Sequence, residues 1–333
     1  MQNRYRTDAH LDLAMDVQKQ RAYGRRRIIE TDYMESVDKG GFGAIVSAIF
    51  IQNDYLPEMA LRMALRQIAE LKNDIAESTR VAFCTSYSQV EKAMLDNKLA
   101  ILMSMEDCIP LNDDLCLLPL MYELGLRFMG LAWNRRNMAC TGATFRQDSC
   151  REKSGLSEFG RRLVQSCVEL GIVLDVSHIN EAGFWDMCEL SSRPMIASHS
   201  NAAKLTPTER NLTDEQIKEI SRREGFIGVN GMSFLIAKNE ADASIELLAD
   251  HIEHIVSVGG IDCVGYGFDF NDPVLKYVPL NEQQLVNGQC RDVIKGYGEV
   301  GVLEAELLKR GFSEQELMLI GGKNFLRFLK ANF

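Results

Sequence analysis

The sequence predicts an α/β protein, a (β/α)₈ TIM-type barrel with additional loops and a C-terminal helix. Short apolar runs alternate with amphipathic segments almost from end to end, which is the order of parallel βαβ units. The runs number eight, which favours a closed barrel over an open sheet. Three of the five histidines come at the ends of predicted strands, where barrel enzymes build their active sites.

The eight predicted strands are runs of β-branched or other apolar residues bounded by turn-forming residues. They lie at residues 9–13, 44–51, 100–105, 128–133, 172–176, 195–199, 226–230 and 263–267. A further short run at residues 80–84 competes for a place in this set.

The predicted helices show apolar residues at a spacing close to 3.6. The clearest lie at residues 58–75, 158–170, 181–190, 213–223 and 245–258, and residues 313–329 form a closing helix. Thr213 with Gln216 three residues later predicts a capping box at a helix start. Residues 270–300 are predicted to form a long loop, which in compact domains often serves as a lid or a binding loop.

Composition limits the partners and the compartment. No Gly/Ser/Pro-rich linker divides the 333 residues, so we expect a single barrel domain over residues 1–333. The net charge of −10 disfavours nucleic acid and anionic membrane surfaces as main partners. No apolar signal segment follows Met1, and no run reaches the ~18 apolar residues of a membrane helix. Nine scattered cysteines fit a reducing cytoplasm.

The first strand carries His10 and Asp12, two positions apart. Alternate strand residues point the same way, so the imidazole and the carboxylate can converge on one point. This pair suits zinc or a similar divalent ion. Taken alone, the pair is better explained as a buried His–Asp hydrogen bond.

Two further histidines and one glutamate also end strands. His178 follows residues 172–176, and His199 ends residues 195–199, with one predicted helix between them. Two strand-end histidines in successive units have the right geometry to share a metal. Glu106 follows an apolar strand, where a buried charge must be paired or bound to metal. Its alternative place is a helix N-cap region or a solvated loop.

Asp269 and Arg210 are candidates for proton transfer and substrate binding. Asp269 follows the last strand and could take a proton from a metal-bound water and return it to the leaving amine; its alternative role is to cap the next loop. Arg210 lies in a loop after the His199 strand and could hold a substrate carboxylate by a bidentate pair. Its alternative is a surface arginine. His251 and His254, on a helix outside the barrel, are predicted to be surface or helix-packing residues.

Taken together, these residues resemble the renal (membrane) dipeptidase family of the metal-dependent amidohydrolase superfamily, over about residues 8–330. The similar runs are DAHLD at 8–12, LDVSH at 174–178, ASHSNA at 197–202, RNLTD at 210–214 and GYGFDF at 265–270. Any one of these motifs is weak, whereas the set is specific.

The resemblance implies a two-zinc centre. His10 and Asp12 would bind one zinc, His178 and His199 the other, and Glu106 would bridge them. A hydroxide between the metals would attack the amide carbon, although other divalent metals also suit these ligands.

For the remaining groups, the resemblance implies that Asp269 acts as general acid and base and that Arg210 holds the C-terminal carboxylate of a dipeptide. It also implies a homodimer.

Two departures bear on the substrate. Family dipeptidases carry a histidine after strand four that contacts the substrate oxygen, and Trp133 stands at that place here. The loss of one such donor can lower the rate roughly 10²–10³-fold, and Asn134 or Arg135 is the available substitute. Asn271 alters the usual Asp-Phe-Asp-Gly motif beside the catalytic aspartate, in a loop expected to touch substrate.

These departures keep alternatives open. One alternative is an amidohydrolase that uses the same metals on a different small amide or ester. Another is a non-catalytic barrel-fold binding protein, which the complete ligand set disfavours.

Overall fold

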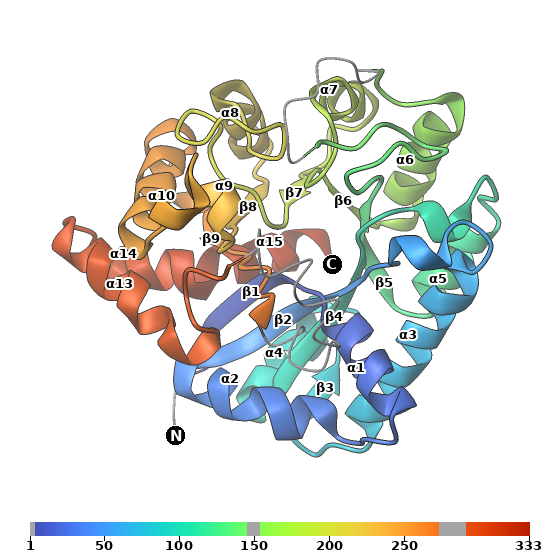
Figure 1. The fold of residues 1–333 in the computed structure, drawn as a ribbon, viewed down its shortest axis with the longest axis horizontal. Coiled ribbons are helices and arrows are strands. Elements are labelled where there is room, and N and C mark those ends of the chain that lie inside the picture. Colours follow the sequence, from blue (N-terminus) through green and yellow to red (C-terminus); the bar gives the residue numbers. More distant parts are fainter. Residues whose placement is uncertain (1–3, 145–153, 273–290) are drawn as a thin grey trace.

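The computed structural model describes residues 4–144, 154–272 and 291–333. Its sheet is parallel throughout, and Figure 1 looks into the ring of strands with the helices around it. In spatial order the strands are β1 (Arg6–Leu11), β2 (Phe42–Ile49), β4 (Leu99–Met105), β5 (Leu126–Gly130), β6 (Val173–Asp175), β7 (Ile196–Ala197), β8 (Phe226–Val229) and β9 (Val264–Tyr266). The short β3 (Val81–Phe83) pairs with β4 off this path.

The barrel is nearly closed, because β9 and β1 meet through single hydrogen bonds and not through a ladder. The backbone N–H of Phe268 donates to Asp8 Oδ1 at 3.1 Å, and that of Asp269 donates to the carbonyl of His10 at 3.3 Å. Tyr297 donates its hydroxyl to the other Asp8 oxygen at 2.8 Å. Asp8, in β1, therefore joins the first strand to the segments that follow the last strand.

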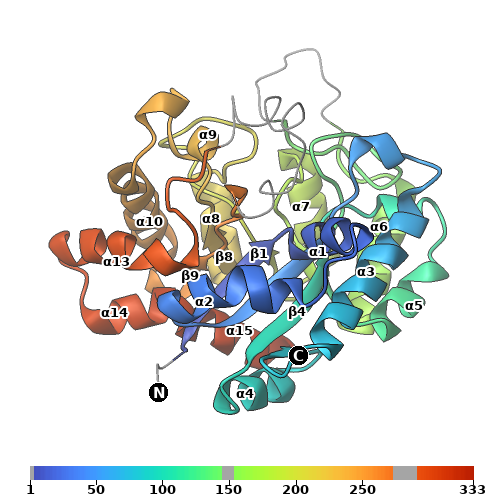
Figure 2. The same cartoon turned by 60° about the horizontal axis from the view of Figure 1, so that its bottom comes forward.

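Helices surround the strands, as Figures 1 and 2 show. They are α1 (Leu13–Ala22), α2 (Met34–Gly40), α3 (Ala60–Ala76), α4 (Tyr87–Leu95), α5 (Leu117–Glu123), α6 (Glu158–Leu170), α7 (Glu181–Leu190), α8 (Asp214–Arg222), α9 (Ser233–Ile236), α10 (Ile245–Gly259), α13 (Val300–Lys309), α14 (Glu314–Met318) and α15 (Asn324–Asn332). The predicted capping box is present: Thr213 and Gln216 hydrogen-bond each other's backbone N–H at the start of α8.

The core has two parts. A large apolar layer fills the space between the strands and the helices, and a smaller cluster fills the barrel itself. At one end the barrel cluster is bulky, since Phe325 of α15 packs 4.9 Å from Phe226 and 6.4 Å from Phe128, ring centre to ring centre. At the opposite, carboxyl end, polar residues follow the strands, among them Glu106 after β4 and Asn230 after β8.

All eight predicted barrel strands are present, with ends that shift by up to three residues. The first begins at Arg6 and stops at Leu11, because α1 starts at Leu13. The competing run at residues 80–84 is a strand, but it is not one of the eight.

The predicted closing helix is broken into α14 and α15 by a π-helical turn at Leu319–Lys323. Of the predicted long loop, residues 273–290 lie outside the described residues. Within the described ranges, no helix is long and apolar enough to cross a membrane.

Candidate metal centre

Three histidines meet at the carboxyl end of the barrel. His10 lies in β1, His178 follows β6, and His199 follows β7, and all three are at least 96% buried. The His178 Nε2 and His199 Nε2 atoms are 2.9 Å apart, and the ring centres of His10 and His199 lie 3.8 Å apart with the rings tilted by 32°. His178 has a φ of 68°, an unusual left-handed conformation for a non-glycine residue that commonly marks functional sites.

Glu106 lies at the centre of this group, one residue after β4. Its Oε1 is 3.0 Å from His178 Nε2, 3.5 Å from His199 Nε2 and 3.8 Å from His10 Nε2. Within the described residues, the ligand atoms of His10, Glu106 and His199 form a group in which all lie within 4.8 Å of one another. The carboxylate thus faces all three imidazoles, which is the position expected of a shared ligand.

Two aspartates complete the acidic side of the site. His10 Nε2 is 3.9 Å from Asp12 Oδ1 and 3.7 Å from Asp269 Oδ1. Asn230, which the sequence analysis missed, donates from Nδ2 to Asp269 Oδ2 at 3.2 Å. Asp269 also has a positive φ of 58°, the left-handed backbone conformation that His178 adopts as well.

Burial dominates the electrostatics. It raises the pKa of Asp12 to about 7, and it raises the pKa values of Glu106 and Asp269 well above their usual range, with the negative charge of Asp12 adding to the effect. Burial lowers the pKa of His10 to about 3 and lowers the pKa values of His178 and His199 well below the usual range. The imidazoles are therefore neutral at pH 7, the form that binds metal.

Arg210 is not a surface residue, since it is only 3% exposed. Its Nη2 donates to the carbonyl of His199 at 3.1 Å, and its Nη1 donates to Ser200 Oγ at 3.3 Å. Burial lowers its pKa to about 10, so the guanidinium stays charged at neutral pH beside Asp269 and Glu106. The structure thus places the one predicted substrate-binding cation next to the candidate metal ligands.

Trp133 lies in an aromatic cluster beside the histidines. The Trp133 ring lies 4.9 Å from that of Phe50 and 6.0 Å from that of His178. The Arg135 guanidinium lies 5.3 Å from the Trp133 ring centre and pairs with Asp107 at 3.1 Å. Asn134, between Trp133 and Arg135 in the sequence, is half-buried.

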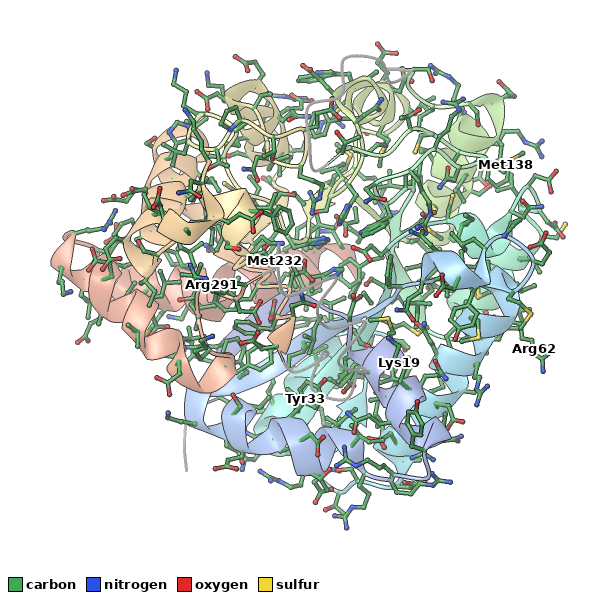
Figure 3. All side chains as sticks on the ribbon, viewed as in Figure 1. Lys19, Tyr33, Arg62, Met138, Met232 and Arg291 are labelled. Carbon is green, nitrogen blue, oxygen red and sulfur yellow. The ribbon has the colours of Figure 1, made fainter. Side chains whose placement is uncertain are left out.

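Asn271 is held through its backbone. Its N–H donates to both carboxylate oxygens of Asp292, at 2.9 and 3.1 Å, and the N–H of Asp272 donates there as well. Met232 pairs with Asp292 in an isolated bridge, and Figure 3 labels Met232 near the middle of the ring, with Arg291 to its left. Asp292 therefore fixes the chain that leaves Asp269, a role that the sequence pattern did not reveal.

The helix-borne histidines lie away from the centre, as predicted from barrel geometry. His251 is fully buried, accepts the N–H of Ala202 at Nδ1 and faces the Ile236 carbonyl at Nε2. His254 pairs with Asp214 of α8 at 2.7 Å. Both pack α10 against its neighbours.

The residues present fit a metal ion. His10 Nε2 and Asp12 Oδ1 are buried, point toward each other, and have no hydrogen-bond partner within the described residues. Such orphaned atoms are costly in a folded protein unless something else binds them. Two nitrogens that each lie about 2.0–2.1 Å from one tetrahedral zinc are about 3.3 Å apart. The two imidazole nitrogens, at 2.9 Å, are within a few tenths of an ångström of that spacing.

Comparison with known proteins agrees with this geometry. The profile of the membrane dipeptidase family, peptidase family M19, matches residues 1–332. An uncharacterized protein from the PQQ-III 3' region of Acinetobacter calcoaceticus is 34% identical over 215 residues, which cover 62% of this chain and 68% of that protein. The dipeptidase tcpJ of Claviceps purpurea is 28% identical over 302 residues, covering 88% of this chain and 67% of that protein.

Solved structures give the same result for the fold. A metallopeptidase from Rhodobacter sphaeroides, liganded with a phosphinate mimic of the dipeptide L-Ala-D-Ala, superposes with a TM-score of 0.86 at 26% identity, with 99% of each chain covered. The dipeptidase AC, a metallopeptidase of family M19, superposes with a TM-score of 0.85 at 28% identity, again over 99% of each chain. The match over nearly the whole chain and the His/Glu/His candidate metal site lead to one conclusion: this chain belongs to the membrane dipeptidase family of metallopeptidases, family M19.

Proposed function

We propose that this protein hydrolyses the amide bond of a small dipeptide with two metal ions, zinc being the first candidate. The proposed ligands are His10 and Asp12 for one ion, His178 and His199 for the other, and Glu106 for both. The observation that carries the proposal is that Glu106 Oε1 lies 3.0–3.8 Å from the Nε2 atoms of all three histidines.

The balance of buried charge supports two ions. The carboxyl groups that act on one another here are Asp12, Glu106, Asp175, Asp269 and Asp292, and Arg210 is the cation facing them. When all are ionised, the group carries about four net negative charges, because the histidines are neutral. One divalent ion would leave about two negative charges uncompensated in a buried site, whereas two divalent ions would balance the group.

The reaction needs a proton carrier beside the metals. When bound, the metal ions would polarise the amide carbonyl and provide a hydroxide nucleophile at neutral pH. Asp269 would accept the proton released in the attack and deliver it to the leaving amine nitrogen. Its Oδ1 lies 3.7 Å from His10 Nε2, and Asn230 fixes its Oδ2, so one oxygen is oriented toward the centre.

Arg210 would bind the substrate carboxylate. Two nitrogens of its buried guanidinium donate hydrogen bonds to Ser200 and to the His199 carbonyl, and the third, Nε, has no hydrogen-bond partner within the described ranges. A dipeptide carboxylate would meet this unsatisfied donor and gain a charge-assisted hydrogen bond. The dipeptide mimic bound by the Rhodobacter sphaeroides relative supports the same substrate class.

A second candidate is an amidohydrolase for a different small amide or ester. Trp133 favours it, because an indole near Phe50 and His178 stands where the resemblance leads us to expect a histidine that contacts the substrate oxygen. A substrate panel with and without a free C-terminal carboxylate separates the two candidates.

The test is hydrolysis of L-L and L-D dipeptides by the purified protein before and after chelation. We expect turnover that chelation abolishes and zinc restores. If the zinc-loaded protein cleaves none of the dipeptides but does cleave blocked amides or esters, the dipeptide assignment is wrong and the second candidate stands.

A further inference from the structure

A buried chain of hydrogen bonds reaches His199 from below the site. Asp175, at the end of β6, accepts at Oδ1 from the backbone N–H groups of Ser177 at 3.0 Å and Ser198 at 3.1 Å. Its Oδ2 accepts from the Ser198 hydroxyl at 2.5 Å. The same hydroxyl oxygen lies 2.7 Å from His199 Nδ1. The residues that form these hydrogen bonds are at least 96% buried, so water does not compete for the bonds.

Counting the protons assigns the direction of each bond. A serine hydroxyl has one proton, and a carboxylate can only accept. Two backbone donors and the hydroxyl are all directed at Asp175, so the Ser198 proton points to Asp175. The remaining proton, between Ser198 Oγ and His199, must then belong to Nδ1. His199 is thereby left with an unprotonated Nε2, the atom that faces Glu106 and His178.

We infer that Asp175 and Ser198 are positioning residues that hold His199 in the Nδ1–H tautomer, with its Nε2 lone pair free to bind metal. The inference rests on the proposed function in one respect, namely that His199 is a ligand. Hydrogen bonds from a ligand's second nitrogen to carboxylates or other acceptors fix its tautomer in many metal sites, and here a serine stands between the two groups.

Separate contacts fix the remaining features of His199. Its backbone N–H donates to Ser177 Oγ at 3.1 Å, and its carbonyl accepts from Arg210. Two glycines make room for the end of β7, since a Cβ on Gly228 or Gly267 would lie 2.1 or 1.8 Å from the Ser198 carbonyl oxygen. Asp175 Oδ1 also holds the backbone before His199, so the property that depends on the path from Asp175 Oδ2 through Ser198 Oγ alone is the proton on the ring.

The isosteric change Asp175→Asn tests this relay directly. Its amide oxygen would accept the two backbone N–H groups, so its NH₂ group would face Ser198 Oγ as a donor. Ser198 would then turn its proton to His199 Nδ1, and the ring would become the Nε2–H tautomer. Ser198→Ala instead leaves Nδ1 without its acceptor, so a mixture of tautomers is expected.

The first readout is ¹⁵N NMR of the histidine rings in the metal-free protein, which is tractable with only five histidines. We expect His199 as Nδ1–H in the wild type, Nε2–H in D175N and a mixture in S198A. The matched control is Ser200→Ala, which removes a buried hydroxyl next to His199 that contacts Ser177 Oγ and Arg210, and it should leave the tautomer unchanged.

The second readout is zinc affinity, measured by competition with a chromogenic chelator. D175N and S198A should each weaken zinc binding about 10–100-fold, and the double variant should be no weaker than the worse single variant, because both break one relay. S200A should stay within about threefold of the wild type. An Nδ1–H ring in D175N, or additive losses in the double variant, would overturn the inference.

These readouts remain informative if dipeptides are not cleaved, since neither uses turnover. If one variant fails to fold, the other still decides the tautomer. If the proposed function is wrong, the protein binds zinc but does not hydrolyse dipeptides. If this inference is wrong, D175N keeps the wild-type tautomer of His199.

Discussion

Glu106 Oε1 lies 3.0 Å from His178 Nε2, although β5 separates the strands that carry the two residues. The contact spans one intervening strand, and the same carboxylate oxygen also lies within 3.8 Å of the Nε2 atoms of His199 and His10. It also makes Glu106 the most consequential single position of the site.

Glu106→Gln should reduce kcat/KM by more than 100-fold and leave less than the full zinc content. Losing a group that merely supports a ligand costs about 10–100-fold in affinity, so losing the central ligand itself should cost more. Elemental analysis and dipeptide turnover on the same sample check this. Full zinc content with unimpaired turnover would show that Glu106 is not a ligand.

The same substitution should stabilise the metal-free protein. Burial and the nearby aspartates raise the pKa of Glu106 well above its usual range, so its ionised form is unfavourable when no cation is bound. Thermal unfolding in chelator should therefore give a higher Tm for E106Q than for the wild type. A lower Tm for E106Q in chelator would contradict this reading of the site's electrostatics.

Asp269→Asn should lower kcat by about 10²–10⁴-fold while zinc content stays at the wild-type level, because the amide cannot carry the proton. The hydrogen bond from Asn230 and the backbone bond to His10 can both remain. Asn230→Ala is the companion variant and should lower kcat less, since it frees the carboxylate without removing it. A D269N enzyme with normal kcat would remove Asp269 from proton transfer.

Arg210→Met should raise KM for dipeptides about 10–150-fold, the equivalent of a charge-assisted hydrogen bond of about 1.5–3 kcal/mol. Dipeptide amides, which lack the carboxylate, serve as the control and should be affected far less. Equal losses for both substrate types would mean that Arg210 supports the His199 backbone and does not recognise the substrate.

Asp16 provides a pH-dependent prediction outside the site. It accepts from Tyr33, labelled in Figure 3, at 2.6 Å and from Gln20 at 2.7 Å, and burial raises its pKa to about 6. A raised pKa means that the folded state holds the proton more tightly, so this contribution to stability is present at low pH and is lost as the pH rises through about 6.

Asp16→Asn does not titrate, so its stability relative to the wild type should improve by roughly 1–1.5 kcal/mol between pH 5 and pH 8. Urea unfolding of both proteins at the two pH values measures this difference, and common effects of other groups cancel. A relative stability that is flat or falls with pH would contradict it.

The fold was predictable because the spacing of apolar residues and the positions of turn-forming residues are properties of the local sequence. The bounds of α6 and α7 agree with the prediction to the residue, and β3 was the one run whose place in the sheet was ambiguous. The break in the closing helix was not predicted, although Gly321 and Gly322 within Leu319–Lys323 are a local signal for an interrupted helix.

The site was predictable only as a set of strand ends. Arg210 could not be told from a surface arginine, because its burial depends on a loop folding over His199. Asp175 and Asp292 were missed for the same reason: their partners come from other elements, and no sequence spacing encodes those contacts. The roles of Trp133 and Asn271 stay predictions that substrate data must decide.

The central claim is a two-metal hydrolase, and titration of the metal-free protein with zinc tests it most directly. Zinc is added in steps, and bound metal per chain and dipeptide turnover are measured at each step. The account predicts saturation at about two ions per chain, with turnover that requires the second. Saturation at one ion per chain with full turnover would contradict it.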